Sequence, residues 1–317
     1  MSLALLFSPQ GSQAVGMGRD LAAGSPAAAS TFVTADATLG LSVSDACWNG
    51  PAELLNDTRQ TQPCLLTVSV AALRALEERA RPAPAFVAGH SVGEYAALVA
   101  AGVIEFEAAL RLVARRGELM AGASAGGGMA AVIGLDRDVV ERVVESVGRA
   151  LDLVVANDNA PGQVVVSGDR EKLAAAEEPM RAAGAKRVIP LPVSGAFHSP
   201  LMASIAEELT AALAAETWSD ARIPILSNVT GEPVVDAGRV RSLLAEQVRS
   251  PVEWMRSVRR MAADGVDTML ELGSGAALVG MVRRIAPDVR AAAINDLATL
   301  DTAAQMLATT QPVTAPA

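Results

Sequence analysis

The chain has 317 residues, enough for one large domain or for a large domain with a smaller one, and 51% of its residues are hydrophobic. Its net charge of −9 argues against nucleic acid as a partner, although local basic patches remain possible. Cys47 and Cys64 lack the spacing of metal ligands and indicate structural thiols in a reduced, cytoplasmic protein. The N-terminus lacks the basic region of a signal peptide, and we expect no membrane span.

The first part of the chain alternates short apolar runs with helical patterns. Residues 3–7 predict a strand that leads into a loop rich in proline and glycine. Residues 62–80 predict a long amphipathic helix, and the apolar run at 85–89 predicts a second, buried strand. Two further helices are expected at 94–102 and 106–123. This alternation indicates an α/β fold with a parallel sheet.

The second predicted strand leads into a G-x-S-x-G sequence at residues 89–93, with Ser91 at its centre. A strand, a sharp turn and a helix form the context that a nucleophile elbow needs. Gly89 and Gly93 let the backbone turn tightly, and Ser91 is expected at the strand end, near the positive end of the following helix. We interpret Ser91 as a candidate nucleophile, with a chance match in a glycine- and serine-rich chain as the alternative.

A second pattern follows the glycines at 126–128, which we interpret as a linker or hinge. The expected elements are a strand at 129–134, a helix at 137–147, strands at 151–158 and 163–169, a helix at 171–184 and a strand at 185–193. This β-α-β-β-α-β order is the ferredoxin-like pattern. It predicts a small domain over residues 125–193, inserted into the larger one.

The α/β pattern then resumes. The expected elements are a helix at 200–215, a strand at 223–229, helices at 240–248 and 252–265, a strand at 268–273 and a helix at 277–286. The tail at 309–317 is rich in proline, threonine and alanine, and we expect it to be disordered.

A serine hydroxyl needs a neighbouring base, and the chain has only two histidines. His90 adjoins Ser91, so its side chain is expected to point elsewhere and to be structural. His198 lies on a loop before a helix and is our candidate for the base that deprotonates Ser91. For the group that orients His198, the sequence leaves Asp236, Asp264 and a backbone carbonyl open.

Seven ordered segments resemble malonyl-CoA:acyl-carrier-protein transacylases, and the resemblance covers nearly the whole chain, to about residue 295. They are residues 9–18, 89–104, 112–120, 157–169, 193–202, 246–254 and 270–285. The resemblance implies an α/β-hydrolase-like catalytic core over residues 1–124 and 194–300, with the ferredoxin-like subdomain at 125–193 inserted.

The resemblance also implies roles for individual residues. Ser91 matches the nucleophile and His198 the base, and Gln247 matches the residue whose backbone carbonyl orients that base. Gln10 and Val92 match the residues whose N–H groups form the oxyanion hole, and two such donors suit a developing oxyanion.

Three further positions are assigned to the substrate. Arg116 matches the arginine that binds the free carboxylate of malonate, for which a planar cation with two donors is suited and lysine is not. Met120 lies in the same segment, and Phe197 would crowd an α-methyl branch of the acyl group. On the sequence alone, a surface arginine and an ordinary core phenylalanine are the alternatives.

One loop departs from the family pattern. The family usually has Pro-Gly where this chain has Ser8-Pro9. Proline fixes φ and has no N–H. If the family glycine adopts φ > 0, the loop that carries Gln10 must shift, while Gln10 keeps its own N–H for the oxyanion hole.

The implied activity is ping-pong transfer of malonyl from malonyl-CoA to the phosphopantetheine thiol of an acyl carrier protein, for fatty-acid or polyketide synthesis. The resemblance implies a monomer and neither a metal nor a redox cofactor. The carrier is acidic, so a basic patch is expected. Its candidates, which otherwise belong to ordinary solvated helix faces, are Arg249, Arg256, Arg259, Arg260, Arg283 and Arg284. A methylmalonyl transferase, an acyl hydrolase acting on carrier proteins and a non-catalytic binding module are the alternatives.

Overall fold

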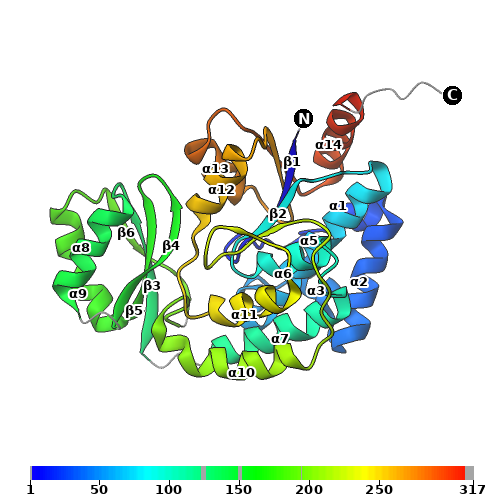
Figure 1. Ribbon diagram of the computed structural model, residues 1–317. Coiled ribbons are helices and arrows are strands. Elements are labelled where there is room, and N and C mark those ends of the chain that lie inside the picture. Colours follow the sequence, from blue (N-terminus) through cyan, green and yellow to red (C-terminus); the bar gives the residue numbers. More distant parts are fainter. Residues whose placement is uncertain (1, 123–125, 149–151, 194, 311–317) are drawn as a thin grey trace.

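The computed structural model describes residues 2–122, 126–148, 152–193 and 195–310, and it contains two sheets (Figure 1). The larger sheet has the order β10-β9-β1-β2-β7-β8. Its strands are β1 (Leu3–Phe7), β2 (Phe86–Gly89), β7 (Ile225–Leu226), β8 (Pro233–Val234), β9 (Thr268–Leu272) and β10 (Arg290–Ile294). All neighbouring pairs are parallel except β7 and β8.

The register of the central strands brings three loops to one edge of the sheet. Phe7, the last residue of β1, pairs with Gly89 of β2 and with Leu272 of β9. The loops that follow these strands therefore begin side by side, as the carboxyl ends of parallel strands do. One of these loops contains Ser91.

Helices cover both faces of the larger sheet (Figure 1). One face packs against α5 (Thr58–Arg79) and α6 (Gly93–Ala100), and α7 (Phe106–Gly122) packs on α5 and α6. The other face packs against α12 (Trp254–Ala263) and α13 (Ala277–Ile285). A strand buried on both sides needs apolar residues at every position, which explains the continuous apolar run of β1.

The burial pattern of β1 shows this double packing. Leu3, Leu5 and Phe7 point to the face covered by α5. Ala4 and Leu6 point to the opposite face and contact the cluster that contains α12. Alternating side chains of one strand thus belong to two different hydrophobic clusters.

Two more helices complete the side of the molecule next to α7. They are α10 (Ala203–Ala214), preceded by a 3₁₀ turn at Pro200–Met202, and α11 (Ala237–Gln247). These helices pack against each other, and α10 also packs against α7.

The second sheet is antiparallel, with the order β4-β5-β3-β6. Its strands are β3 (Gly127–Ile133), β4 (Leu153–Ala160), β5 (Gln163–Asp169) and β6 (Arg187–Pro190), and it packs against α8 (Arg137–Val147) and α9 (Arg170–Ala182) around a hydrophobic cluster of its own. A parallel bridge between Asn157 and Val252 joins β4 to the segment before α12. The side chain of Arg137 also forms an ion pair with Glu253, at 2.7 Å.

Several elements were not predicted from the sequence. They are α1 (Arg19–Gly24), α2 (Pro26–Leu39), α3 (Val43–Asn49), α4 (Ala52–Leu55), β8, β10 and α14 (Leu297–Thr310). Signals for α2 were present, because Ser25 caps its N-terminus through Ala28 N, Pro26 is its first residue, and Gly40 ends it with φ 64°.

Two sequence-based predictions need correction. The glycines at 126–128 are not a free linker, because Gly127 and Gly128 belong to β3. A Cβ on Gly127 would lie 2.7 Å from the backbone nitrogen of Ala196, so a close approach explains this glycine. The predicted disordered tail is wrong at its start, because α14 includes residues 309 and 310, while 311–317 lie outside the described residues. No helix among the described residues has both the length and the apolar character needed to cross a bilayer.

Candidate active site

Ser91 lies at a sharp turn between β2 and α6, with a φ of 55°. Non-glycine residues seldom adopt such a φ, and where they do the strain is often associated with function. The flanking glycines are required by contact: a Cβ on Gly89 would lie 1.9 Å from the Gly93 carbonyl oxygen, and a Cβ on Gly93 would lie 2.3 Å from the Phe7 carbonyl oxygen. The G-x-S-x-G spacing thus follows from the packing of α6 against the strand ends.

Asn228, in the loop after β7, holds this turn from the side. Its Oδ1 accepts a hydrogen bond from Ser91 N at 2.7 Å, and its Nδ2 donates to the Gly89 carbonyl at 2.7 Å. The side chain is 1% exposed. One buried amide therefore binds the backbone on both sides of His90, and no sequence signal pointed to it.

The candidate base contacts the candidate nucleophile. Ser91 Oγ lies 2.8 Å from His198 Nε2, and His198 Nδ1 lies 2.8 Å from the Gln247 carbonyl oxygen. Because that carbonyl can only accept, Nδ1 carries the proton and Nε2 has a free lone pair for the serine hydroxyl. His198 is held by a further bond from its backbone N–H to the Val248 carbonyl at 2.9 Å, and its φ is 57°.

The acidic alternatives for orienting His198 lie elsewhere. Asp236 caps the N-terminus of α11 through Arg239 N, and Asp264 accepts a hydrogen bond from Arg260. The backbone carbonyl of Gln247 occupies the position that either carboxylate would have needed. The arrangement is a Ser–His pair with a carbonyl as the third group.

The protonation state of His198 suits a base. Burial and the nearby Arg116 cation lower its pKa to about 3, against the opposing effect of its bond to Gln247. The imidazole is therefore neutral at physiological pH, and its lone pair is available to Ser91.

The guanidinium of Arg116 contacts the candidate nucleophile. The residue is 1% exposed, and its guanidinium donates to Gln62 Oε1 at 2.7 Å, to Gln247 Oε1 at 3.0 Å and to Ser91 Oγ at 3.1 Å. All three acceptors are neutral, and Arg116 Nε has no hydrogen-bond partner among the described residues. A buried cation in such surroundings is ready to bind an anion beside Ser91. Sequence reasoning missed Gln62, because a glutamine within a long helix carries no distinctive signal.

A cavity of about 260 Å³ opens above Ser91. From the larger domain it is lined by Pro9, Gln10, Gly11, Gln13, Asn56, His90, Ser91, Met120, Phe197 and His198. From β3, β4 and the segment after β6 it is lined by Met129, Asn157, Leu191, Pro192 and Val193. The cavity thus lies between the domain of the larger sheet and the domain of the antiparallel sheet. Gln10, Met120 and Phe197, which the sequence singled out, line it. Val92, which is buried, follows Ser91 as the N-cap of α6.

His90 does not contact Ser91 Oγ in this arrangement. Its Nε2 lies 2.8 Å from Asn159 Oδ1, and its ring centroid lies 5.5 Å from that of Trp254. The ring packs near Trp254, as expected of a structural histidine, and His90 also lines the cavity.

The loop with the Ser8-Pro9 departure is anchored by side chains. Ser8 Oγ donates to Glu271 Oε1 at 3.1 Å, and Ser12 Oγ donates to the Pro9 carbonyl at 2.6 Å. Gln10 Nε2 donates to Thr58 Oγ1 at 3.2 Å. These bonds hold the loop beside the cavity and leave the backbone N–H of Gln10 within the segment that lines it.

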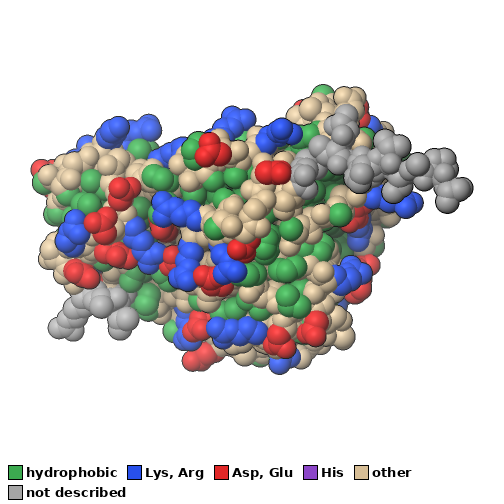
Figure 2. Space-filling model, turned by 45° about the horizontal axis from the view of Figure 1, so that its top comes forward, with side chains coloured by type: hydrophobic (Ala, Val, Ile, Leu, Met, Phe, Trp, Pro, Cys, Tyr) green, Lys and Arg blue, Asp and Glu red, His purple; other side chains and the backbone are tan. Residues whose placement is uncertain are grey.

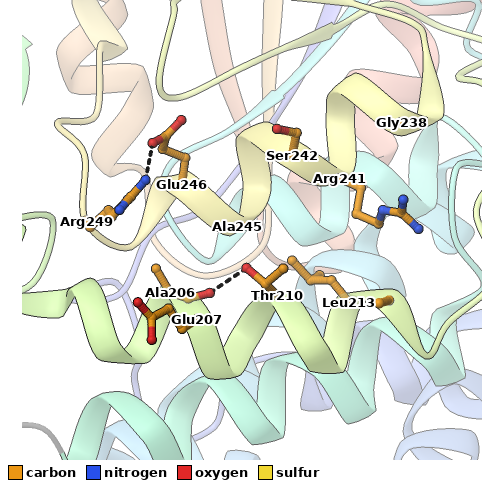
Figure 3. A pocket seen from close by; sticks show the side chains of 11 residues that line it. Ala206, Glu207, Thr210, Leu213, Gly238, Arg241, Ser242, Ala245, Glu246 and Arg249 are labelled. Atoms are coloured by element: carbon orange, nitrogen blue, oxygen red, sulfur yellow. Dashed lines mark hydrogen bonds and ion pairs between the residues drawn. The ribbon is translucent and has the colours of Figure 1, made fainter.

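A larger cavity, of about 420 Å³, lies between α10 and α11 (Figure 3). Its lining includes Thr210, Arg241, Ser242 and the Glu246–Arg249 ion pair. It contains none of the candidate catalytic residues, so its size alone does not make it the reaction site.

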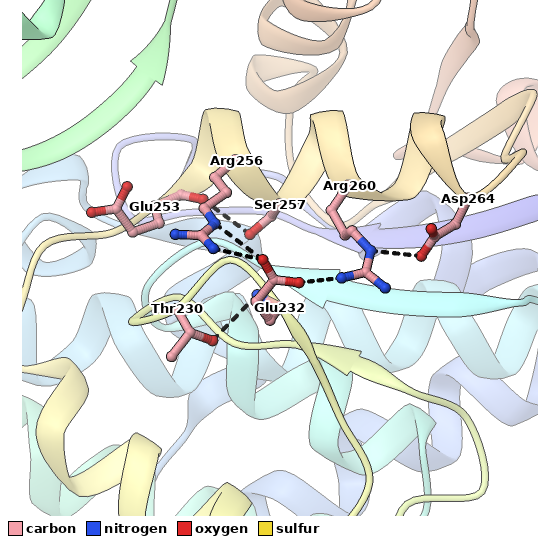
Figure 4. Close-up of polar contacts among 7 residues, drawn as sticks. All are labelled: Thr230, Glu232, Glu253, Arg256, Ser257, Arg260 and Asp264. Carbon is pink, nitrogen blue, oxygen red and sulfur yellow. Dashed lines mark hydrogen bonds and ion pairs between the residues drawn. The ribbon is translucent and has the colours of Figure 1, made fainter.

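On the face drawn in Figure 2, Lys and Arg side chains lie interspersed with Asp and Glu side chains. Accordingly, half of the arginines proposed as a basic patch are paired with carboxylates of the same chain. Glu232 accepts from both Arg256 and Arg260, and Asp264 accepts from Arg260 at 2.8 Å (Figure 4). Arg249 pairs with Glu246 in the same way. The two in α13 bond to uncharged groups instead: Arg283 donates to the Ala291 carbonyl, and Arg284 donates to Gln163 and to the Pro161 carbonyl.

Comparison with known proteins gives a consistent result. The model of the acyl transferase domain family matches residues 4–305. The chain is 43% identical to the malonyl CoA-acyl carrier protein transacylase of Salmonella typhimurium over 95% of its own length and 98% of the relative's. It is 41% identical to the enzyme of the same name from Bacillus subtilis, over 96% and 97%.

Solved structures agree with these relatives. An acyl carrier protein S-malonyltransferase from Vibrio cholerae superposes with a TM-score of 0.93 at 39% identity, covering 96% of this chain and 100% of that one. A malonyl-transacylase solved in complex with its type II PKS acyl-carrier protein superposes with a TM-score of 0.94 at 40% identity, also covering 96% and 100%.

Proposed function

The chain belongs to the acyl transferase family and is an acyltransferase, and on that premise we propose that it moves the malonyl group of malonyl-CoA to the phosphopantetheine thiol of an acyl carrier protein. The observation that carries the mechanism is the continuous set of bonds from the Gln247 carbonyl through His198 to Ser91 Oγ, with Arg116 on the same oxygen. It supports a nucleophile, its base and an anion-binding group within one buried site.

In the first step, Ser91 Oγ attacks the thioester carbonyl of malonyl-CoA while His198 Nε2 takes the hydroxyl proton. The N–H groups of Gln10 and Val92 are proposed to donate hydrogen bonds to the carbonyl oxygen as negative charge develops on it. The C–S bond then breaks, the sulfur of coenzyme A takes the proton from His198, and a malonyl ester remains on Ser91.

The second step reverses the first with a different thiol. The phosphopantetheine thiol of the carrier gives its proton to His198, and its sulfur attacks the malonyl ester. Collapse of the intermediate breaks the bond to Ser91 Oγ, which recovers the proton. Water must stay out during this exchange, and the position of the cavity between the two domains supports such exclusion.

Selection of malonate is proposed to rest on Arg116. Its Nε and the nitrogen that now bonds Ser91 Oγ supply two donors for the malonyl carboxylate. Met120 and Phe197 form part of the cavity wall, where their bulk would crowd an α-methyl branch. Such steric selection is worth about 1–3 kcal/mol, so a low rate with methylmalonyl-CoA is expected.

The fold supports a finer description. The larger sheet with its nucleophile turn favours an α/β-hydrolase-like core over residues 1–124 and 194–300. The order β4-β5-β3-β6 favours a ferredoxin-like subdomain over the described part of residues 125–193.

We further propose a monomer that works in the cytoplasm and receives its carrier near Arg283 and Arg284, the patch arginines that bond only to uncharged groups in the described part of the chain.

The test is intact-mass spectrometry of the protein mixed with malonyl-CoA. A malonyl adduct on the wild-type protein and none on Ser91→Ala is the expected result. An adduct on Ser91→Ala, or none on either protein, would contradict the assignment of the nucleophile.

A further inference from the structure

The side chain of Gln247 lies between two buried ionisable groups. Its Nε2 donates to Glu94 Oε2 at 2.6 Å and to the Ser91 carbonyl at 3.1 Å. Its Oε1 accepts from Arg116 at 3.0 Å. Since its backbone carbonyl also accepts from His198 Nδ1, this single residue contacts the nucleophile, the base and the arginine.

Glu94 is buried without a part in the proposed reaction. It is the second residue of α6 and is 4% exposed, and it lines a small, mostly apolar void with Ile225, Ser227, Val234, Val240 and Leu243. A carboxyl group in such a place is costly unless its oxygens are hydrogen-bonded. Its side-chain partner is the Gln247 amide, which in turn is a partner of Arg116.

Only one orientation of the Gln247 side-chain amide satisfies all its hydrogen-bond partners. If it turned by 180°, its two N–H groups would face the guanidinium of Arg116, which can only donate. Its oxygen would then face Glu94 and the Ser91 carbonyl, which are acceptors. The Glu94 carboxylate and the Ser91 carbonyl therefore both oppose this rotation, and together they keep an acceptor in front of Arg116.

The charge of Glu94 is not needed for this action. Burial raises the pKa of Glu94 to about 7, while hydrogen bonds from Gln247 and the Asn228 backbone and the Arg116 cation lower it. Tyr95 is a further ionisable group beside Glu94 and Arg116, and burial keeps its hydroxyl neutral by raising its pKa. Both forms of Glu94 are thus present near neutral pH. Each form has an oxygen that can accept from the Gln247 amide, and the Ser91 carbonyl accepts from it in both.

We propose that Glu94 is a positioning residue for malonyl recognition: by fixing the Gln247 amide, it keeps the Arg116 guanidinium directed at the acyl group on Ser91. The inference rests on the proposed function, because it assigns Glu94 to the selection of the carboxylated substrate. It predicts that Glu94 affects the preference for malonyl over acetyl groups and not merely the stability of the fold.

The experiment compares three variants at this position with a matched control. Glu94→Met fills the space without an acceptor, Glu94→Ala removes the side chain, and Glu94→Gln keeps an acceptor without a charge. Glu107→Ala, an exposed glutamate of α7, is the control. The readout is the rate of acyl-enzyme formation with malonyl-CoA and acetyl-CoA by quenched-flow mass spectrometry, after thermal unfolding has shown which variants fold.

We expect Glu94→Met and Glu94→Ala to lower the malonyl-to-acetyl ratio by about 10- to 100-fold, mainly through a higher KM for malonyl-CoA. Glu94→Gln should restore the ratio to within about threefold of the wild type, and Glu107→Ala should not change it. In an Arg116→Ala background, Glu94→Met should leave the ratio unchanged, because the residue through which Glu94 acts is gone.

Three results would overturn the proposal: an unchanged ratio in a folded Glu94→Met or Glu94→Ala protein, a loss in Glu94→Gln as large as in Glu94→Met, or a full Glu94 effect without Arg116. Failure of the proposed function looks different. In that case the wild-type protein itself forms no malonyl adduct, and the Glu94 proposal falls with it.

Discussion

Replacing Arg116 by alanine should remove the preference for malonyl over uncharged acyl groups. The structure provides two donors for the carboxylate, namely Nε and the nitrogen that now bonds Ser91 Oγ. A hydrogen bond to a charged group contributes about 1.5–3 kcal/mol, so the two together contribute about 3–6 kcal/mol. At about 1.4 kcal/mol per factor of ten, the malonyl-to-acetyl ratio of kcat/KM should fall roughly 10²- to 10⁴-fold.

The assay is the release of coenzyme A from malonyl-CoA and from acetyl-CoA, with holo carrier protein as the acceptor. Arg115→Ala is a close control, because Arg115 is the adjacent residue of α7 but is exposed and pairs with Glu118 and Glu208. It should retain the wild-type ratio. Thermal unfolding of Arg116→Ala must accompany the kinetics, since Gln62 and Gln247 each lose a hydrogen-bond partner.

The malonyl-to-acetyl ratio of kcat/KM decides the outcome, and the rate with malonyl-CoA alone does not. If Arg116→Ala lost malonyl and acetyl transfer to the same extent, the guanidinium would serve the fold or the Ser91 hydroxyl and not the carboxylate. The same parallel loss in Arg115→Ala would show that substitutions on this helix act without regard to the substrate.

Three further predictions follow from the geometry. Burial and Arg116 lower the pKa of His198 to about 3, so the base stays neutral and the acylation rate with acetyl-CoA should be nearly constant between about pH 5 and 8. A pH–rate profile whose midpoint lies near the ordinary histidine pKa would contradict this. Asn228→Ala should lower the free energy of unfolding by about 1–3 kcal/mol for each of the two backbone groups left without a partner, and should lower kcat; wild-type kcat in the folded variant would show that the turn needs no such clamp. Phe197→Ala should raise kcat/KM for methylmalonyl-CoA relative to malonyl-CoA by about 10- to 200-fold, measured by competition of the two thioesters, and an unchanged ratio would remove the ring from substrate selection.

The parts of the fold that were predictable have strong local patterns. The apolar runs of β1 and β2 mark strands buried on both faces, and α8 was predicted with the bounds that the structure has. Helices α1, α3 and α4 were not predicted because they span only 6, 7 and 4 residues, too few for a periodic pattern, and they have no side-chain cap at their N-termini. Helix α2 was not predicted because its alanine, serine and threonine residues give weak periodicity and its caps were the only clear signals. Hydrophobic periodicity reports burial of a face, and these short helices owe their stability to packing on α5.

The candidate site divides in the same way. Ser91 and His198 carry local signals, in a glycine-flanked turn and in the rarity of histidine. Gln62, Glu94 and Asn228 carry none, because their roles arise from contacts with residues 54, 153 and 137 positions away in the chain. Reasoning from the residues alone left the group that orients His198 open, since a backbone carbonyl is present at every residue, and only the family resemblance pointed to Gln247.

The most direct test of the account is the fate of the isolated malonyl-enzyme. Protein acylated with malonyl-CoA is freed of excess thioester, divided, and mixed either with holo carrier protein or with buffer, and the masses of both proteins are followed in time. The account predicts that the malonyl group moves from Ser91 to the carrier much faster than it is lost in buffer. Loss to free malonate at the same rate with and without the carrier would contradict transfer and identify a hydrolase.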